Sequence, residues 1–549
     1  MSRNVYRDVI VEGISVPVGT AEADILRRAE KKMKRIGVKT ETLHFRLYKK
    51  SVDARRKDDI RFVCSVLCQF AEDGAGIDAE AAARLGLKPL VRPPLTFEMG
   101  QTPLVGRPLV VGMGPAGLFC AYILAMNGYA PILIDRGDSV ADRVKAVERF
   151  YAFGVLDTES NIQFGAGGAG TFSDGKLLTR INDARCAYVL ETFCRMGAPE
   201  EILVSARPHV GTDILRGVVQ AMLDAIEQAG GTVCYRCCLT DIRPMPDGGF
   251  SVATTAGEWK AGAVVLALGN SARDTFRMLL EKNFLIEPKP ISVGVRIEHL
   301  REDVDRMFYG PMAGHPDLGA AEYHFSDTRG ERGVYTFCMC PGGEVVAGAS
   351  EDGTVVVNGM SYHARDGKNS NSAIVVSVHP EDFEPVENSR VLGAIAFQHA
   401  IEQRAFGAGG SNYNVPLQTV GDFLEGIGDA ATHEPTRVQP SYMGGGHYRL
   451  APMTEILPPF VCSALQTGLC SFDRKQPGFA ARDAILSGAE TRTSSPLRIM
   501  RGEDLCAVGY PGIYPCGEGA GYAGGITSAA VDGIRVAQAL MQAHAPERS

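Results

Sequence analysis

The sequence lacks long apolar runs and is poor in tryptophan. No window approaches the roughly 18 continuous apolar residues of a membrane-spanning helix. The opening residues MSRNVYRDVIVEG also have no apolar segment after their charges, which is unlike a secretory signal. We therefore expect a cytoplasmic protein with no membrane partner. Its 45% of hydrophobic residues and single Trp are otherwise typical of a globular protein.

Metal-ligand spacing is also absent from the sequence. The 14 cysteines and 11 histidines form no set with credible spacing, so we expect no bound metal. Most cysteines lie within apolar runs, as Cys64 and Cys462 do, which is typical of reduced core thiols. The segment CYRCC contains a CxxC, but it begins on a predicted strand, where residues three apart point to opposite faces. We therefore interpret Cys234 and Cys237 as structural.

Residues 1–95 have the pattern of a small separate module. A strand, a helix beginning at an N-cap Thr20 and ending near Gly37, and two further strands predict the order βαββ. The module carries six more positive than negative charges within a chain of net charge −8. Its basic residues are interpreted either as a solvated face or as a surface for RNA. The proline-rich stretch LKPLVRPPLTFEMGQTPL then predicts a linker, with residues 96–106 between the module and the next domain.

A dinucleotide-binding pattern begins directly after this linker. Residues 107–137 predict a strand, a glycine turn, a helix and a second strand, with the glycines at Gly112, Gly114 and Gly117. Asp135 ends the second strand, 23 residues after Gly112, where a carboxylate accepts hydrogen bonds from ribose hydroxyls. Three neighbours complete the contacts expected at this end of the cofactor: Pro115, Ala116 and Arg136.

The glycine motif by itself does not distinguish an NAD site from an FAD site. The C-terminal run GIYPCGEGAGYAGGITSAA does distinguish them. It resembles the pattern of glutathione-reductase-type flavoproteins, in which a late strand ends in an acidic residue and a helix follows. The resemblance places Gly517 and Glu518 near the ribityl and pyrophosphate region, and Gly524, Gly525 and Ile526 at the helix start. A helix N-terminus there would favour negative charge on the flavin ring. FAD is therefore the predicted cofactor.

Longer blocks resemble a bacterial family of FAD-dependent dehydrogenases of unassigned substrate. The resemblance spans the chain, and Asn270 stands where that family's pattern has His. These are the blocks that carry it: FGAGGAGTFSDGKL, PHVGTDILR, LALGNSARDTF, FCMCPGGEVV, RKQPGFA, ETRTSSPLRI and YPCGEGAGYAGGITSAA. The resemblance implies an FAD-dependent oxidoreductase.

The first of these blocks predicts a loop that approaches the cofactor. Gly167 and Gly168 would let the backbone come close to the pyrophosphate or the flavin, and Ser173 and Lys176 would donate hydrogen bonds near the flavin ring. Gly269 ends another buried strand and is a further candidate for a cofactor contact.

The predicted fold class is α/β, with a Rossmann-type FAD-binding domain and an inserted domain. The FAD-binding domain comprises residues 107–284 and 496–549. Between them, residues 285–495 are rich in alternating strands, which predicts an antiparallel β-rich substrate domain.

The predicted function is hydride transfer between FAD and a small, anionic substrate, with RNA binding or RNA modification as the alternative. The candidate catalytic residues are Lys176, Arg365, His447 and Arg492. The arginines suit carboxylate or phosphate anchoring. No second GxGxxG follows a strand, so the electron donor is open between transient NAD(P)H, a protein donor and the substrate itself.

Overall fold

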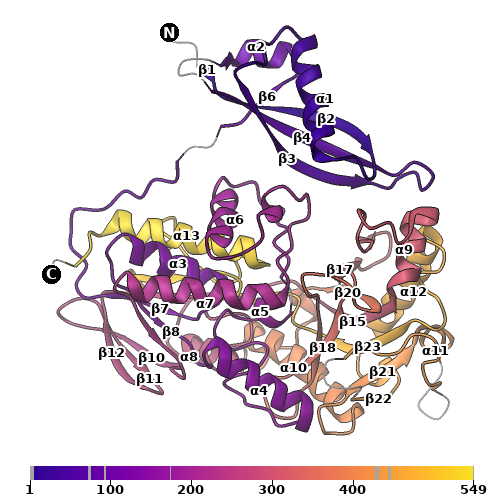
Figure 1. Ribbon diagram of the computed structural model, residues 1–549. Coiled ribbons are helices and arrows are strands. Elements are labelled where there is room, and N and C mark those ends of the chain that lie inside the picture. Colours follow the sequence, from indigo (N-terminus) through magenta and orange to yellow (C-terminus); the bar gives the residue numbers. More distant parts are fainter. Residues whose placement is uncertain are drawn as a thin grey trace.

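The computed structural model describes residues 5–71, 76–91, 94–173, 175–426, 432–442 and 447–547. It is a mixed α/β structure in which the N-terminal module forms a small lobe beside a larger body (Figure 1). The body contains a parallel sheet and a larger, mainly antiparallel sheet. No described helix is long and apolar enough to cross a membrane.

The N-terminal module is a four-stranded antiparallel sheet with a helix packed against it. The strand order is β3-β4-β2-β6, formed by Leu43–Asp53, Arg61–Phe70, Asp8–Pro17 and Lys88–Pro89. Helix α1 (Glu22–Arg35) buries Ile25, Ala29 and Met33, which lie on one face at a spacing of four residues. The predicted order βαββ is present, and three short elements join it: β1 (Val5–Tyr6), β5 (Ile77–Asp78) and α2 (Ala79–Arg84).

The outer edge of β3 contacts the body of the protein. The Lys50 N–H donates to the Val204 carbonyl at 2.9 Å, and the Ala206 N–H donates to the Lys50 carbonyl at 3.0 Å. Several basic side chains of the module are held in exposed ion pairs, including Arg55 with Asp53. Such pairs are typical of a solvated surface.

The parallel sheet positions the candidate site. Its strand order is β25-β13-β7-β8-β9, formed by Ile513–Pro515, Ala263–Leu266, Pro108–Val111, Ile132–Ile134 and Thr232–Cys234. Figure 1 shows three long helices close together on one side of it: α3 (Pro115–Met126), α7 (Thr212–Gln228) and α13 (Ile526–Ala543).

Alternate residues of the parallel strands face different cores. Val110 and Val265 pack with the three long helices, whereas Leu109 and Val264 pack toward the small antiparallel sheet β10-β11-β12. That small sheet comprises Leu239–Pro244, Phe250–Thr254 and Gly257–Ala261. Both faces of the parallel strands are thus buried, as their continuous apolar sequence predicts.

The larger sheet has seven strands in the order β16-β17-β20-β15-β23-β21-β22. They are Ser326–Asp327, Val334–Cys340, Asn369–Val378, Ile291–Leu300, Ile485–Glu490, Val415–Thr419 and Tyr448–Leu450. All pairs are antiparallel except β21 with β22. The hairpin of β18 (Glu344–Gly348) and β19 (Val356–Met360) accompanies this sheet.

Buried polar groups occupy the middle of this sheet. On β15, Arg296 and Glu298 are both fully buried. One Glu298 oxygen accepts from the Asn369 side chain at 2.8 Å and from Ser441, while its Oε1 has no hydrogen-bond partner among the described residues. Burial raises the pKa of Glu298 to about 7.

Glu298 is expected to make stability depend on pH. Because its pKa is higher in the folded than in the unfolded chain, protonation favours folding, and that contribution decreases as pH rises from about 4.5 to about 7. Glu298→Gln imitates the protonated acid. Between pH 5.5 and pH 8, the free energy of unfolding of this variant should therefore fall by about 2 kcal/mol less than that of the unmodified chain. Urea unfolding of both proteins at the two pH values measures this, and parallel pH dependences would contradict it.

Candidate functional site

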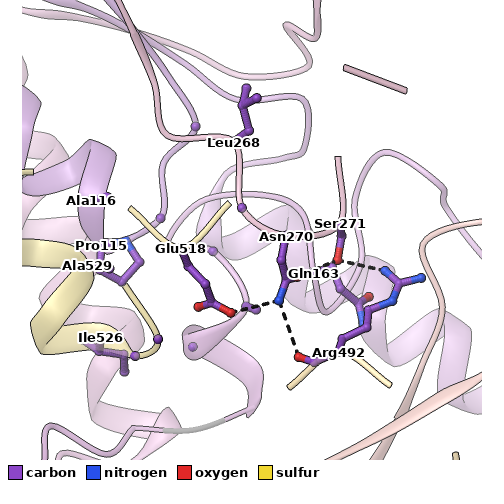
Figure 2. Close-up of a pocket in the computed structure, with 18 of the residues that line it drawn as sticks. Pro115, Ala116, Gln163, Leu268, Asn270, Ser271, Arg492, Glu518, Ile526 and Ala529 are labelled. Atoms are coloured by element: carbon purple, nitrogen blue, oxygen red, sulfur yellow. Dashed lines mark hydrogen bonds between the residues drawn. The ribbon is translucent and has the colours of Figure 1, made fainter. Parts of the chain in front are cut away.

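A large cavity lies at the carboxyl ends of the parallel strands, where open α/β sheets bind ligands. Its volume is about 1280 Å³, which includes the solvent space at its open mouth. The segments after β7, β13 and β25 line one part of it, and residues of the larger sheet line another. Figure 2 labels lining residues from the segments after β7, β13 and β25, among them Pro115, Leu268 and Glu518.

The glycine turn after β7 leaves no room for side chains. A Cβ on Gly112 would lie 2.2 Å from the Ala267 carbonyl oxygen, and one on Gly117 would lie 1.9 Å from the Gly112 carbonyl oxygen. Gly114, Pro115 and Ala116 line the cavity at the start of α3, together with Gly112. The N–H groups of this helix start therefore lie where a phosphate group can bind.

Asp135 also lines the cavity, directly after β8. Its two carboxylate oxygens accept the N–H groups of Met113 and Gly137, both at 2.8 Å. A carboxylate oxygen can accept more than one hydrogen bond, so the group can also receive ribose hydroxyls. Arg136 does not line the cavity: its guanidinium donates to Glu159 and Asp274.

The predicted glycine loop contacts the turn and supplies part of the wall. The Gly167 N–H donates to the Met113 carbonyl at 2.9 Å. Gly168 lines the cavity, whereas Gly167 and Lys176 do not. Lys176 instead donates to the Cys340 sulfur at 3.2 Å. Ser173 ends the short helix α5 (Gly170–Ser173), and its side chain lies outside the described part of the chain.

The segment after β25 closes the cavity from the C-terminal side. Glu518 lines it and accepts from the Asn270 side chain at 2.9 Å (Figure 2). Gly524, Gly525 and Ile526 line it at the start of α13. Gly517 lies behind the wall, with its N–H donating to Asp532 at 2.8 Å.

Several glycines leave the space in front of them open. A Cβ on Gly269, Gly524 or Gly525 would meet no atom within 4 Å. Close packing therefore does not explain these positions. A left-handed backbone with a φ of +73° accounts for Gly269, whereas a flat ligand lying against the backbone accounts for Gly524 and Gly525. Together with the helix starts and the two carboxylates, this arrangement fits the phosphates, sugar and ring of a dinucleotide such as FAD.

Residues that the sequence reasoning missed line the part of the cavity next to the larger sheet. They include Gln163, Phe337, Cys338, Asn358 and Glu490. Phe337 and Cys338 lie at a bulge in β17, and Cys338 has a φ of +43°. Such a backbone is uncommon for a non-glycine residue and is concentrated at functional sites. In the sequence, the segment FCMCPGG shows only two cysteines two residues apart, and this spacing does not predict the unusual backbone.

Glu490 is held by a fully buried cation. The Arg296 guanidinium donates to Glu490 Oε2 at 2.6 Å and to Asn371 Oδ1 at 2.7 Å. Burial raises the pKa of Glu490, although the Arg296 cation opposes that shift. The cavity thus has a buried carboxylate in its wall, at the end next to the larger sheet.

Arg492 belongs to a buried ion cluster. Its guanidinium donates to both Glu402 oxygens and to the hydroxyls of Ser271 and Ser350. Arg273 donates to the same Glu402 carboxylate at 2.8 and 2.9 Å. Burial acts to raise the pKa of Glu402, yet the two arginine cations hold it well below its usual range.

The other catalytic candidates lie away from the cavity wall. Arg365 is paired with Glu322 at 2.7 Å, and His447 is exposed just before β22. Neither lines the cavity in the part of the chain that the structure describes. That same part contains no group of three or more metal-ligating side chains.

The segment that forms the larger sheet matches a known family model. Residues 290–493 match the family model described as "FAD-dependent protein, C-terminal domain-like". FAD is the cofactor that this match indicates. Two solved structures are similar over about four fifths of the chain. Tetracycline destructase Tet(51) is 13% identical, with coverage of 80% of this chain and 82% of that one and a TM-score of 0.32.

CtdE in complex with FAD is 10% identical, with coverage of 79% and 83% and a TM-score of 0.30. Both TM-scores are low, so no feature of those proteins is carried over to this chain. A much nearer relative is an uncharacterized protein of Clostridium beijerinckii. It is 44% identical over 529 residues, which cover 94% of this chain and 96% of that protein. The chain therefore belongs to the same protein family as this Clostridium beijerinckii protein, and residues 290–493 match the C-terminal domain model of an FAD-dependent protein.

Proposed function

We propose that the protein is an FAD-dependent oxidoreductase that transfers hydride between the flavin and a small molecule. The observation that carries this proposal is the two-ended cavity. One end has the glycine turn and Asp135, which suit the adenosine and pyrophosphate of a dinucleotide, and the other has a polar wall formed by the larger sheet. The proposed architecture is a Rossmann-type FAD domain with an inserted, β-rich substrate domain.

The residues that line the cavity support a proposed place for each part of FAD. Asp135 would bind the ribose, and the start of α3 at Gly114 and Pro115 would bind the pyrophosphate. Glu518 would bind the ribityl chain, and the start of α13 would face the flavin ring. FAD supplies the hydride chemistry when it is bound, and the chain supplies orientation and exclusion of water.

The substrate would bind between the flavin and the larger sheet. Glu490, Asn358 and Cys338 line that region and offer a carboxylate, an amide and a thiol. The predicted anionic character of the substrate receives no support from these contacts. Arg492 is neutralised by Glu402, and Arg296 is neutralised by Glu490. We therefore propose a small substrate that donates hydrogen bonds to Glu490, rather than one anchored by a guanidinium.

Spectroscopy of the purified protein tests the proposed function. A flavin absorption band that bleaches on anaerobic addition of NADH or NADPH would support it and identify a transient nicotinamide donor. A flavin band that persists with both nucleotides would favour a protein donor or the substrate as reductant. A colourless chain that does not take up added FAD would overturn the proposal.

Substitution of Gly525 tests where the flavin lies. Because a Cβ at this position meets nothing within 4 Å, Gly525→Ala should leave the melting temperature of the FAD-free chain unchanged. With FAD bound the methyl group would press on the ring, so FAD affinity should fall roughly 10-fold or more. Titration of FAD fluorescence measures this. An unchanged affinity would move the flavin away from α13.

A further inference from the structure

Arg143 is a fully buried cation without a carboxylate partner in the described part of the chain. It lies in the first turn of α4 (Val140–Phe153), whose N-cap is Ser139. Burial lowers the pKa of Arg143 to about 9, so the side chain is still a cation at neutral pH. The Asp135 carboxylate acts to raise this pKa, but no ion pair joins the two groups in the described part of the chain. A buried charge without an ion pair is costly, so its presence needs an explanation.

Four backbone carbonyls hold the Arg143 guanidinium. Its Nε donates to the Asn161 carbonyl at 2.8 Å, and its Nη1 donates to the Ala166 and Gly168 carbonyls at 2.8 Å and to Gly165 at 3.2 Å. Three of them, at Gly165, Ala166 and Gly168, belong to the glycine loop that contributes to the cavity wall, and Asn161 precedes that loop. Because a peptide unit is planar and trans, each carbonyl turned toward Arg143 directs its peptide N–H the opposite way.

A second arginine increases the positive charge behind this loop. The guanidinium groups of Arg143 and Arg216 lie 4.6 and 4.4 Å from the centre of the same ring, Phe172. The buried Arg143 Nη2 and Arg216 Nε have no hydrogen-bond partner among the described residues. Two cations with unused donors thus lie together, although like charges repel and buried polar groups are normally satisfied.

The loop connects these cations to the dinucleotide turn. A Cβ on Gly168 would lie 2.9 Å from the Gly114 Cα, so the two backbones are in contact. Gly114 is the N-cap of α3, where the pyrophosphate of FAD is placed under the proposed function. The Gly168 backbone therefore contacts both the Arg143 guanidinium and the N-cap of α3.

We propose that Arg143 is a positioning residue whose charge is balanced by the diphosphate of the bound dinucleotide. It would fix the loop through the four carbonyls and attract the anion across one layer of backbone, in a region where burial weakens screening. This inference depends on the proposed FAD site and adds a residue that does not itself line the cavity.

Two substitutions separate charge from shape. Arg143→Gln keeps amide donors for the carbonyls but removes the positive charge. Arg143→Lys keeps the charge but loses the forked arrangement of guanidinium N–H donors. We expect Arg143→Gln to weaken FAD binding roughly 10- to 100-fold and Arg143→Lys to weaken it less. The dissociation constant of ADP, which carries the diphosphate, should rise in Arg143→Gln by a similar factor. Fluorescence titration of the full-length FAD-free chain measures both.

Arg332 provides the matched control, because it lies over the Phe460 ring but is paired with Asp382. Arg332→Gln should lower the melting temperature with and without FAD equally and leave FAD affinity unchanged. If Arg143→Gln does not stay folded without FAD, its urea midpoint at increasing FAD concentrations reports the same affinity.

FAD affinities of Arg143→Gln and the unmodified chain within threefold of each other would overturn the inference while leaving the proposed function intact. Equal losses in Arg143→Gln and Arg143→Lys would also overturn it, because they would assign the effect to shape alone. Failure of the unmodified chain to bind FAD would instead remove the proposed function itself.

Discussion

Gly117→Ala is expected to abolish FAD binding and to destabilise the fold. The new methyl carbon would lie 1.9 Å from the Gly112 carbonyl oxygen and 3.4 Å from the Ala267 Cβ. These neighbours are backbone and a buried side chain, so the clash can be relieved only by moving α3 away from β7. We expect a loss of roughly 3 kcal/mol in folding stability. Flavin content after purification and the urea midpoint measure the two effects.

Gly217→Ala is the matched control for that substitution. Gly217 lies inside α7, and a Cβ there would meet nothing within 4 Å. Alanine is the better helix former, so this variant should be more stable by roughly 0.5–1 kcal/mol and should bind FAD normally. If Gly117→Ala retains both flavin and stability, the close contact of α3 with the turn is not required for the site.

Glu402→Gln is expected to have the second large effect, because it leaves the buried Arg492 without a carboxylate partner and Arg273 with only Glu351. Glu402 lies on α10 (Arg390–Ala408) and receives Arg273 from α8 (Arg273–Glu281) and Arg492 from the segment after β23. Removing one partner of a buried ion pair costs about 3–5 kcal/mol. The urea midpoint should fall accordingly at pH 7.

An exposed ion pair tests whether burial causes that effect. Glu425 pairs with Arg482 at the surface, where the Glu425 side chain is 47% exposed. Glu425→Gln should change stability by less than about 1 kcal/mol. Equal effects of the two glutamine variants would contradict the structural role of the buried cluster. Because Arg492 and Ser271 also line the cavity, Glu402→Gln should weaken FAD binding as well.

Local patterns in the sequence predicted the glycine turn and Asp135 because their geometry depends on near neighbours. The helix start in the N-terminal module was predicted less well. Thr20 was expected as the N-cap, but Ala21 occupies that position and the Thr20 hydroxyl donates to the Pro17 carbonyl. A hydroxyl side chain beside a helix start can hydrogen-bond either to the helix N-terminus or to the preceding turn, and the sequence does not determine which bond forms.

The end of the cavity next to the larger sheet could not be predicted because its residues come from separate strands. Glu490 is identified by its contact with Arg296, which is 194 residues away along the chain. The sequence also predicted Arg492 and Arg365 as anchors from their residue type alone. Their partners Glu402 and Glu322 are distant in sequence, so no local pattern could show that the guanidinium groups are already paired.

The strand order of the parallel sheet bears on how the chain folds. The central strand β7 begins at Pro108, but β25 at the sheet edge begins only at Ile513. During synthesis the N-terminal module can complete its short-range pairings early, whereas β13 keeps an unpaired edge until β25 has emerged. Glu518 and α13 follow β25, so the cofactor site is assembled among the last parts of the fold. Contacts between such distant residues slow folding. FAD can therefore stabilise the protein only after most of the fold has formed.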